Sequence, residues 1–196
     1  MNIKTKIITF EGIRGSGKST NAQKLYEYLS KNFKVIYSKD DKELLDNLFN
    51  KLERDINKLF KSKLNKLTKM LLIAAKSREF YELRINPYIG KYDYIILDTG
   101  QFYNFCYSEV DINDSCIIFE YIYRKTYNSD LNILCDLLPN SASKRFKDDR
   151  KITYHENARR LFLKAADIYP NFRIIDTGIY NEEQAHNVIV NIIDNF

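Results

Sequence analysis

The sequence predicts an α/β fold of three layers, in which a parallel five-stranded sheet carries helices on both faces. Three observations lead to this prediction. Strand-like and helix-like segments alternate along the whole chain, and repeated strand–helix units build parallel sheets. A glycine-rich loop joins the first such strand to the first such helix. The chain has 196 residues and a hydrophobic content of 44%, which suits one compact domain with a full core.

The glycine-rich loop decides the kind of α/β fold. It reads Gly12-Ile13-Arg14-Gly15-Ser16-Gly17-Lys18-Ser19 and fits the phosphate-binding P-loop pattern G-x-x-x-x-G-K-[ST]. Before it, residues 3–11 are rich in Ile and Thr, as a buried strand would be. After it, residues 20–32 place Ala22, Leu25 and Leu29 on one helical face. Because strand, loop and helix follow in the required order, the sequence predicts a three-layer P-loop NTPase fold.

The P-loop predicts ATP and Mg²⁺ as ligands. Its glycines let backbone N–H groups turn inward around phosphate oxygens, and the N-terminus of the following helix adds partial positive charge. We expect Lys18 to reach the β- and γ-phosphates and the Ser19 hydroxyl to help hold the metal ion. The nucleotide-binding residues expected from the motif are Gly12, Ile13, Arg14, Gly15, Ser16, Gly17, Lys18, Ser19 and Thr20.

The elements after the first helix follow from hydrophobic periodicity and capping signals. Residues 34–38 read as a strand, and Asp40 or Asp41 is a candidate cap for the helix that follows. A further helix is expected at about 63–89, with Asn86-Pro87 as its frayed end. The apolar run 92–98 reads as a buried strand that ends in a carboxylate.

The last third of the chain repeats the strand–helix pattern. Residues 131–137 read as the fourth strand and 172–176 as the fifth. Between them, Thr153 and Glu156 have capping-box spacing before a helix that Pro170 would stop. A last helix carries Ala185, Val188, Ile189 and Ile192 at helical spacing.

The carboxyl ends of the predicted strands are where a ligand should bind, because parallel α/β sheets hold ligands at that edge. The P-loop, Asp98 and the segment after residue 137 would gather there. Asp98 closes an apolar strand, where P-loop enzymes place a carboxylate associated with Mg²⁺. The other interpretation of Asp98 is an ordinary polar strand end. Given the P-loop, we expect Ser19 and Asp98 to hold the metal ion.

A basic run lies between the fourth strand and the next helix, with the sequence Lys144-Arg145-Phe146-Lys147-Asp148-Asp149-Arg150-Lys151. We expect a mobile lid at about 143–153 that closes over the phosphates and excludes water, since hydrolysis of ATP is the competing reaction. Arg145 and Arg150 are the leading candidates for neutralising charge there. The alternative is a solvated charge run.

Composition argues against several other classes of protein. The net charge is +5, but basic residues are spread among acidic ones, which favours an enzyme of polyphosphate anions over a nucleic-acid binder. Cys106, Cys116 and Cys135 form neither a zinc pattern nor a disulfide framework, so we expect buried free thiols. His155 and His186 are expected on the surface. With no transmembrane run and no evident signal peptide, a cytoplasmic protein without membrane contact is expected.

The order and spacing of these segments resemble thymidylate kinase, a family of nucleoside monophosphate kinases, over nearly the whole chain. The matching segments are Phe10-Glu11-Gly12 with the P-loop, a base-reading helix at 71–78, the strand and loop at 94–108, the lid at 144–150, and the C-terminal part through 172–176. The resemblance implies transfer of the ATP γ-phosphate to a deoxynucleoside monophosphate, typically dTMP. It also implies a homodimer formed through helices of the middle region.

On the acceptor side, the chain departs from the residues that the resemblance implies. Arg78, or Ser77 in an alternative register, would contact the base, and Tyr107 matches a tyrosine near the base pocket. Thr99 stands where the family has an arginine that binds phosphate. Arg14 stands where the family P-loop has an acidic residue that touches the sugar. Because both side chains would project toward the same pocket, we expect Arg14 to compensate for the missing arginine.

Three further positions also differ from the family. After the second strand, the chain has Lys39 as the single cation in place of an Arg-Glu-Pro-Gly-like stretch. Tyr103 and Asn104 stand where small hydroxyl residues are usual. Ile73 and Ala74 occupy the region of the family's base-stacking aromatic residue. The donor half of the resemblance is intact and the acceptor half is altered.

Together these observations predict ATP-dependent phosphorylation of dTMP to dTDP by a single P-loop kinase domain spanning residues 1–196. The expected catalytic residues are Lys18, Arg14, Asp98, Arg145 and Arg150, and the expected acceptor-binding residues are Glu11, Lys39, Arg78, Asp98, Tyr103 and Tyr107. Two alternatives stay open. The missing arginine favours a kinase of deoxynucleosides or of another small acceptor, with Glu11 or Asp98 as base. The other is a protein that binds nucleotide without transferring phosphate.

Overall fold

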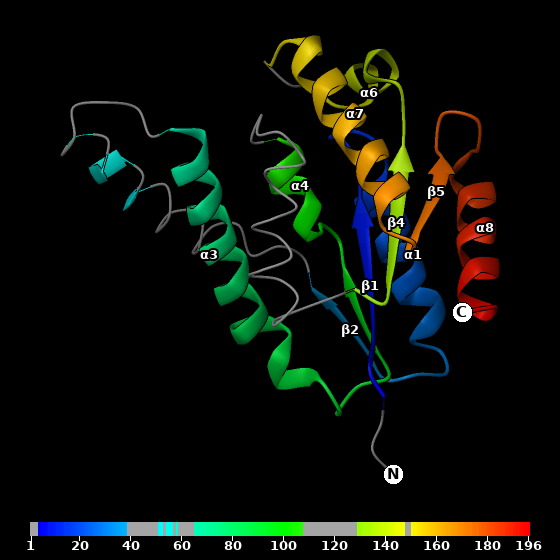
Figure 1. The fold of residues 1–196 in the computed structure, drawn as a ribbon. Coiled ribbons are helices and arrows are strands. Elements are labelled where there is room, and N and C mark those ends of the chain that lie inside the picture. The colour runs from blue at the N-terminus through cyan, green and yellow to red at the C-terminus, as the bar shows by residue number, and fades with distance from the viewer. Residues whose placement is uncertain are drawn as a thin grey trace.

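The chain folds into a central sheet with helices on both sides (Figure 1). This computed structural model describes residues 4–38, 51–52, 54–56, 58, 65–107, 129–147 and 150–196. The strands are β1 (Lys6–Glu11), β2 (Val35–Ser38), β3 (Tyr94–Leu97), β4 (Leu131–Asp136) and β5 (Phe172–Asp176). The helices are α1 (Lys18–Leu29), α3 (Lys66–Arg84), the 3₁₀ helix η1 (Asn86–Tyr88), α4 (Gln101–Cys106), α6 (Pro139–Arg145), α7 (Ile152–Ile168) and α8 (Glu182–Asp194).

All five strands are parallel and lie in the order β2-β3-β1-β4-β5, which confirms the predicted sheet. β1 is central, because Ile8 is paired with Ile96 of β3 on one side and Leu131 of β4 on the other. Connections lead to one side of the sheet after β1 and to the other side after β3. The point where the strand order reverses therefore lies beside β1, which is where sheets of this kind bind ligands.

Side chains alternate along the strands and bury both faces of the sheet. Ile8 and Phe10 of β1 belong to an apolar cluster with residues of α1 and α8. Ile7 and Ile95 point the other way and belong to a cluster with Ile85 and partly buried residues of α3 and η1. The apolar runs identified in the sequence are therefore strands with both faces covered.

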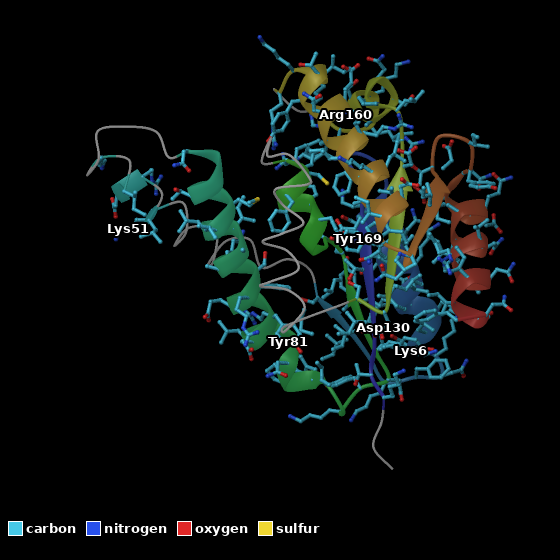
Figure 2. The ribbon with its side chains drawn as sticks, in the orientation of Figure 1. Lys6, Lys51, Tyr81, Asp130, Arg160 and Tyr169 are labelled. Carbon is cyan, nitrogen blue, oxygen red and sulfur yellow. The ribbon has the colours of Figure 1, made fainter. Side chains whose placement is uncertain are left out.

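A third apolar cluster joins α3, α4, α6 and α7 to the sheet beside the P-loop. Figure 2 shows Tyr169 directly after α7, where its ring lies 5.2 Å from the ring of Phe102 between centroids. Phe102 also packs edge-on against Phe172 of β5, with the centroids 5.1 Å apart. These contacts hold α4, which carries candidate site residues, against the body of the fold.

The long middle helix is shorter than predicted. α3 ends at Arg84, because Ile85 leaves the helical region with φ −120° and ψ −55°. Asn86, Pro87 and Tyr88 form η1 instead of continuing the helix to residue 89. Pro87 accounts for this break, since proline has no backbone N–H and disfavours helical dihedrals in the residue before it.

The capping box predicted at Thr153 and Glu156 is wrong. α7 begins at Ile152, so both residues lie inside the helix, and the N-cap Lys151 makes no capping hydrogen bond through its side chain. A reciprocal capping box exists at α8, where Asn181 accepts from the backbone N–H of Gln184 and Gln184 accepts from that of Asn181. The prediction that the helix stops before Pro170 is correct.

The basic run after β4 is not a loop throughout. Lys144 and Arg145 form the last turn of α6, which begins at Pro139, a residue suited to a first helical turn. The predicted lid at 143–153 therefore includes the end of α6 and the start of α7. Asp148 and Asp149 lie outside the described residues.

Several other predictions fall wholly or partly outside the described residues. These are Lys39, the cap at Asp40 or Asp41, most of the helix that would follow it, and Cys116. Cys106 and Cys135 are buried free thiols, as predicted. In the part of the chain that the structure describes, no helix combines the length and apolar character needed to cross a membrane.

Candidate active site

The P-loop runs from the end of β1 to the start of α1 and is enclosed by two other elements. Gly12 has φ +133°, and a Cβ atom there would lie 2.4 Å from the carbonyl oxygen of Cys135 in β4. Gly15 has φ +78°, and a Cβ atom there would lie 2.7 Å from the carbonyl oxygen of Ala142 in α6. Glycine is therefore required at both positions by backbone conformation and by close packing. The loop is held in shape by β4 and α6 as well as by its own sequence.

Lys18 lies inside the P-loop, with 7% of its surface exposed. Its Nζ donates to the carbonyl oxygen of Ile13 over 2.9 Å and lies 5.2 Å from the centre of the Tyr103 ring. The backbone N–H of Ser16 donates to the same Ile13 carbonyl over 3.2 Å. The ammonium group is thus fixed beside the inward-facing backbone, where it adds positive charge to a phosphate cradle.

Two buried carboxyl groups, those of Glu11 and Asp98, lie at the ends of the neighbouring strands β1 and β3. Glu11 Oε1 accepts from the backbone N–H of Phe102 over 3.0 Å. Loss of solvation raises the pKa of Glu11 to about 8, against the lowering effects of that hydrogen bond and of Lys18. Asp98 Oδ2 accepts from the Tyr37 hydroxyl over 3.2 Å, and burial together with Asp98 raises the pKa of Tyr37.

The second oxygen of each carboxyl group has a different environment from the first. Glu11 Oε2 and Asp98 Oδ1 are buried and accept no hydrogen bond from any described residue. Ser19 is exposed and lies at the start of α1. No cluster of three or more His, Cys, Asp or Glu residues exists among the described residues. A small number of protein ligands is consistent with Mg²⁺, because this ion keeps several waters and binds through one or two carboxylates plus substrate phosphates.

A cavity of about 730 Å³ opens beside the P-loop, and we call it the donor cavity. Three segments line it: the P-loop with the start of α1, the end of α6, and the turn from β5 into α8. Arg145 lies in its wall, and its Nη2 donates to the carbonyl oxygen of Thr177 over 2.8 Å. Sequence reasoning identified the P-loop and Arg145 but missed Thr177, Tyr180 and Asn181. The missed signal was the strand end at Asp176, which reaches the same edge as Asp98.

Arg14 is not among the residues that line the donor cavity, and its hydrogen bonds lead to α4 and the residue after it. Its backbone N–H donates to the Tyr107 hydroxyl over 3.0 Å, and its Nε donates to the Tyr103 hydroxyl over 2.9 Å. Its guanidinium carbon lies 5.9 Å from the centre of the Phe146 ring. The guanidinium carbon of Arg150 lies 5.5 Å from the centre of the Tyr107 ring. We call Arg14, Tyr103, Tyr107 and Arg150 the acceptor-side cluster.

Within the candidate site, Arg145 and Arg150 occupy different places although both were predicted in one lid. Arg145 lines the donor cavity, whereas Arg150 lies over the rings of Tyr107 and Tyr154. Arg145, at the end of α6, and Arg150, shortly before α7, therefore lie on different sides of the P-loop.

His155 is buried, which corrects the prediction that both histidines lie on the surface. It is 8% exposed, and its Nδ1 shares a hydrogen bond of 3.0 Å with the Tyr107 hydroxyl. The periodicity of α7 indicates this burial, because residue 155 lies one turn before the buried Ala158 and two turns before the buried Phe162. Burial raises the pKa of Tyr107 despite the opposing effects of Arg14 and Arg150.

One of the predicted acceptor residues, Arg78, is not recorded in this cluster, and another cannot be placed. Arg78 forms an ion pair of 2.5 Å with Glu82 on its own helix α3, and 40% of its side chain is exposed. Lys39 lies outside the described residues. The structure brings together Glu11, Arg14, Lys18, Asp98, Tyr103 and Tyr107 at the carboxyl edge of the sheet.

A sequence model described as thymidylate kinase matches residues 10–189. The chain belongs to the thymidylate kinase family. Thymidylate kinase of Orientia tsutsugamushi (strain Ikeda) is 28% identical over 208 residues, covering 97% of this chain and 93% of that protein. Thymidylate kinase of Ehrlichia canis (strain Jake) is 38% identical over 92 residues, covering 46% and 45%.

A solved structure gives the same result for the fold. The crystal structure of thymidylate kinase from Ehrlichia chaffeensis has a TM-score of 0.70, covers 96% of this chain and 98% of that chain, and is 22% identical. The family and the P-loop fold predicted from the sequence are thereby confirmed. Membership of the thymidylate kinase family makes this chain a nucleoside monophosphate kinase.

Proposed function

We propose that this chain transfers the γ-phosphate of ATP to dTMP and forms dTDP and ADP, within a single P-loop kinase domain. The observation that carries this proposal is the position of the P-loop between two cationic places. Arg145 lies on the donor-cavity side and Arg14 on the acceptor side, with Lys18 between them in the loop. Phosphoryl transfer depends on positioning and on cations around the moving group, and this arrangement supplies both.

ATP binds with its phosphates in the P-loop. Backbone N–H groups of residues 12–20 surround the phosphate oxygens, and Lys18 neutralises the β- and γ-phosphates. The donor cavity takes the rest of the nucleotide, and its volume of about 730 Å³ suits a ligand of this size. Arg145 adds positive charge at the wall of the same cavity.

Ser19 and Asp98 hold Mg²⁺. The buried oxygen Oδ1 of Asp98, which accepts no hydrogen bond from the described residues, supports this role. When bound, the ion would neutralise charge on the phosphates.

The acceptor-side cluster receives dTMP. Arg14 replaces the missing phosphate-binding arginine at Thr99, and the hydroxyl of Tyr103 holds its guanidinium in place. Arg150 and Tyr107 lie beside it and complete the pocket. The attacking phosphate oxygen of dTMP is already ionised, so no strong base is required. Glu11 lies at the base of the site, where its buried carboxyl contributes to acceptor binding.

A kinase of hydroxyl acceptors is the second candidate, and Glu11 favours it. A buried carboxyl group with a pKa of about 8 is a strong base once it is deprotonated. Such a base would activate the 5′-hydroxyl of a deoxynucleoside. The two candidates differ in the acceptor alone, so one assay separates them.

The decisive experiment incubates the purified protein with ATP, Mg²⁺ and either dTMP, dUMP, dGMP or thymidine. With dTMP we expect the products ADP and dTDP, which chromatography detects. Lys18→Ala should lose this activity. Product from thymidine but not from dTMP would replace the proposal by the second candidate. Tight ATP binding without transfer to any acceptor would identify a non-catalytic nucleotide-binding protein.

The remaining predictions concern assembly and location. We propose a homodimer, supported by Leu71 and Leu83 of α3, which are 45% and 59% exposed. Analytical ultracentrifugation tests it, and a single species of 23.3 kDa would contradict it. A cytoplasmic location stays a prediction, which cell fractionation tests.

A further inference from the structure

Thr177 occupies a fixed place at the edge of the donor cavity. It follows directly after β5 and is 4% exposed. Its backbone N–H donates to the carbonyl oxygen of Asp136 over 2.9 Å, which extends the pairing of β4 and β5 by one residue. The carboxylate of Asp136 is held in turn by Arg159, through two hydrogen bonds of 2.7 Å. Thr177 is therefore anchored to the carboxyl ends of β4 and β5.

The hydroxyl of Thr177 reaches the P-loop. Its Oγ1 lies 2.9 Å from the carbonyl oxygen of Ser16 and 3.0 Å from that of Asp136. A hydroxyl has one proton to donate, and the Asp136 carbonyl already accepts the backbone N–H of Thr177. Ser16 is fully buried, so its carbonyl oxygen needs a donor inside the protein. The geometry assigns the hydroxyl proton to Ser16.

The carbonyl group of Thr177 reaches α6. It accepts from Nη2 of Arg145 over 2.8 Å, and Arg145 lines the donor cavity. Thr177 is thus bonded to the P-loop through its side chain and to Arg145 through its main chain.

We propose that Thr177 is a positioning residue of the donor site. By fixing the Ser16 carbonyl outward, its hydroxyl turns the peptide that follows so that the loop keeps its backbone N–H groups directed at phosphate. By accepting from Arg145, its carbonyl holds that guanidinium at the cavity wall. The proposal rests on the donor role given to the P-loop under the proposed function, and it adds a residue outside every motif of the sequence.

Replacement of the hydroxyl tests the first link. Thr177→Val keeps the branched shape and removes the donor, so the Ser16 carbonyl must find water and the loop populates conformations that do not bind ATP. We expect KM for ATP to rise roughly tenfold, while KM for dTMP changes less than about twofold. Thr177→Ser restores the donor and should return KM for ATP to near the wild-type value.

A matched control separates this role from general stability. Thr5 Oγ1 donates to the carbonyl oxygen of Tyr92 over 2.6 Å, far from the site at the opposite edge of the sheet. Thr5→Val removes this hydrogen bond and the one that Thr5 Oγ1 accepts from the backbone N–H of Gly90 over 2.8 Å. It should lower the unfolding temperature without changing KM for ATP. If Thr177→Val lowers the unfolding temperature and leaves KM for ATP unchanged, Thr177 has a structural role alone and the proposal fails.

A double-mutant cycle tests the second link. Arg145→Met should weaken ATP binding less in the Thr177→Val background than in the wild type. Valine keeps the main-chain carbonyl that accepts from Arg145, but without the hydroxyl the turn is loosened and this carbonyl no longer holds the guanidinium in place. Fully additive effects would contradict the link to Arg145. If Thr177→Val does not fold, Thr177→Ala supplies the same comparison with Thr177→Ser.

Calorimetry keeps the proposal separate from the proposed function. Binding of ATP with Mg²⁺ is measured directly for the wild type, Thr177→Val and Thr177→Ser. A wild type that binds ATP but phosphorylates no acceptor would end the proposed function, and a weaker Kd in Thr177→Val alone would still support the positioning role. Equal Kd values in all three proteins would end the inference.

Discussion

Arg14 and Tyr103 form a direct hydrogen bond of 2.9 Å between the guanidinium Nε and the phenol hydroxyl. The same phenol ring lies 5.2 Å from Nζ of Lys18. One aromatic side chain therefore separates and orients two cations of the P-loop. Both Arg14 and Tyr103 are departures from the family pattern, and they contact each other, which suggests that they work as a pair.

Arg14→Ala should impair use of the acceptor far more than binding of ATP. A hydrogen bond between a charged donor and a phosphate is worth more than a neutral one, so we expect KM for dTMP to rise by about 10- to 100-fold. The Kd for ATP should change less than about threefold, because the loop backbone stays in place. Steady-state kinetics with varied dTMP and calorimetry with ATP measure the two effects.

Tyr103→Phe is the matched control for this pair. It removes the hydroxyl that orients Arg14 but keeps the ring beside Lys18, so a smaller rise in KM for dTMP of about threefold to tenfold is expected. An effect of Tyr103→Phe in the Arg14→Ala background would contradict the idea that Tyr103 acts through Arg14.

The buried carboxyl group of Glu11 should make stability depend on pH. Its pKa is about 8 in the folded state, against an ordinary value of 4.5, so the folded protein keeps a proton that the unfolded chain releases. Stability should therefore fall as pH rises from about 4.5 to about 8, and then level off. Glu11→Gln keeps the shape without the charge and should remove this part of the pH dependence.

Urea unfolding at several values between pH 5 and pH 8 measures the effect of Glu11. The advantage of Glu11→Gln over the wild type should grow with pH. Glu156→Gln, at an exposed position of α7, is the control and should give a curve parallel to the wild type. A parallel curve for Glu11→Gln as well would sink this prediction.

Gly100→Ala should destabilise the fold for steric reasons. A Cβ atom there would lie 1.9 Å from Glu11 Oε1 and 2.1 Å from Thr9 Cγ2. The backbone at Gly100 is extended, with φ −93° and ψ −177°, so alanine meets no conformational penalty. We expect a loss of about 3 kcal/mol in the free energy of unfolding, because buried atoms must move.

Gly90→Ala separates the steric effect from the backbone effect. Gly90 has φ +77° but nothing within 4 Å of its Cβ position, so about 1 kcal/mol of strain is expected there. Chemical denaturation of both variants gives the comparison. An equal loss in the two variants would show that close packing at Gly100 is not the cause.

Arg159 should be replaceable by lysine only at a cost. Its Nε and Nη2 donate to the two oxygens of Asp136, each over 2.7 Å, and the Asp136 side chain is 12% exposed. Lysine cannot form this paired contact, so Arg159→Lys should lose about 1 kcal/mol and Arg159→Ala about 2 kcal/mol. Thermal unfolding measures both, and an unchanged stability in Arg159→Lys would mean that the second hydrogen bond contributes nothing.

The sheet and the P-loop could be predicted because each depends on a local pattern. Apolar runs such as that at 94–97 identify strands buried on both faces, and the spacing of Gly12, Gly17 and Lys18 identifies the cradle. Helix ends were less predictable. The α7 start was misplaced by two residues, because the N-cap is Lys151, whose side chain makes no capping hydrogen bond, and not Thr153.

The wall of the donor cavity that lies opposite the P-loop, formed by the end of α6 and the turn from β5 into α8, could not be predicted, because distant parts of the chain assemble it. Thr177 belongs to no motif, and its contacts with Ser16 and Arg145 exist only once β4 and β5 have paired. The hydrogen bond between His155 and Tyr107 has the same origin, since Tyr107 lies at the end of another helix, α4. Periodicity within one element carries no information about such partners.

The three supports of the P-loop set an order of events during synthesis. The loop sequence is complete once residue 19 has been made, but the groups that shape it are the carbonyls of Cys135 and Ala142 and the hydroxyl of Thr177. A nascent chain emerging from the ribosome N-terminus first therefore carries the motif long before it has a cradle. The chain can therefore bind nucleotide only late in synthesis, after β5 and Thr177 have been made.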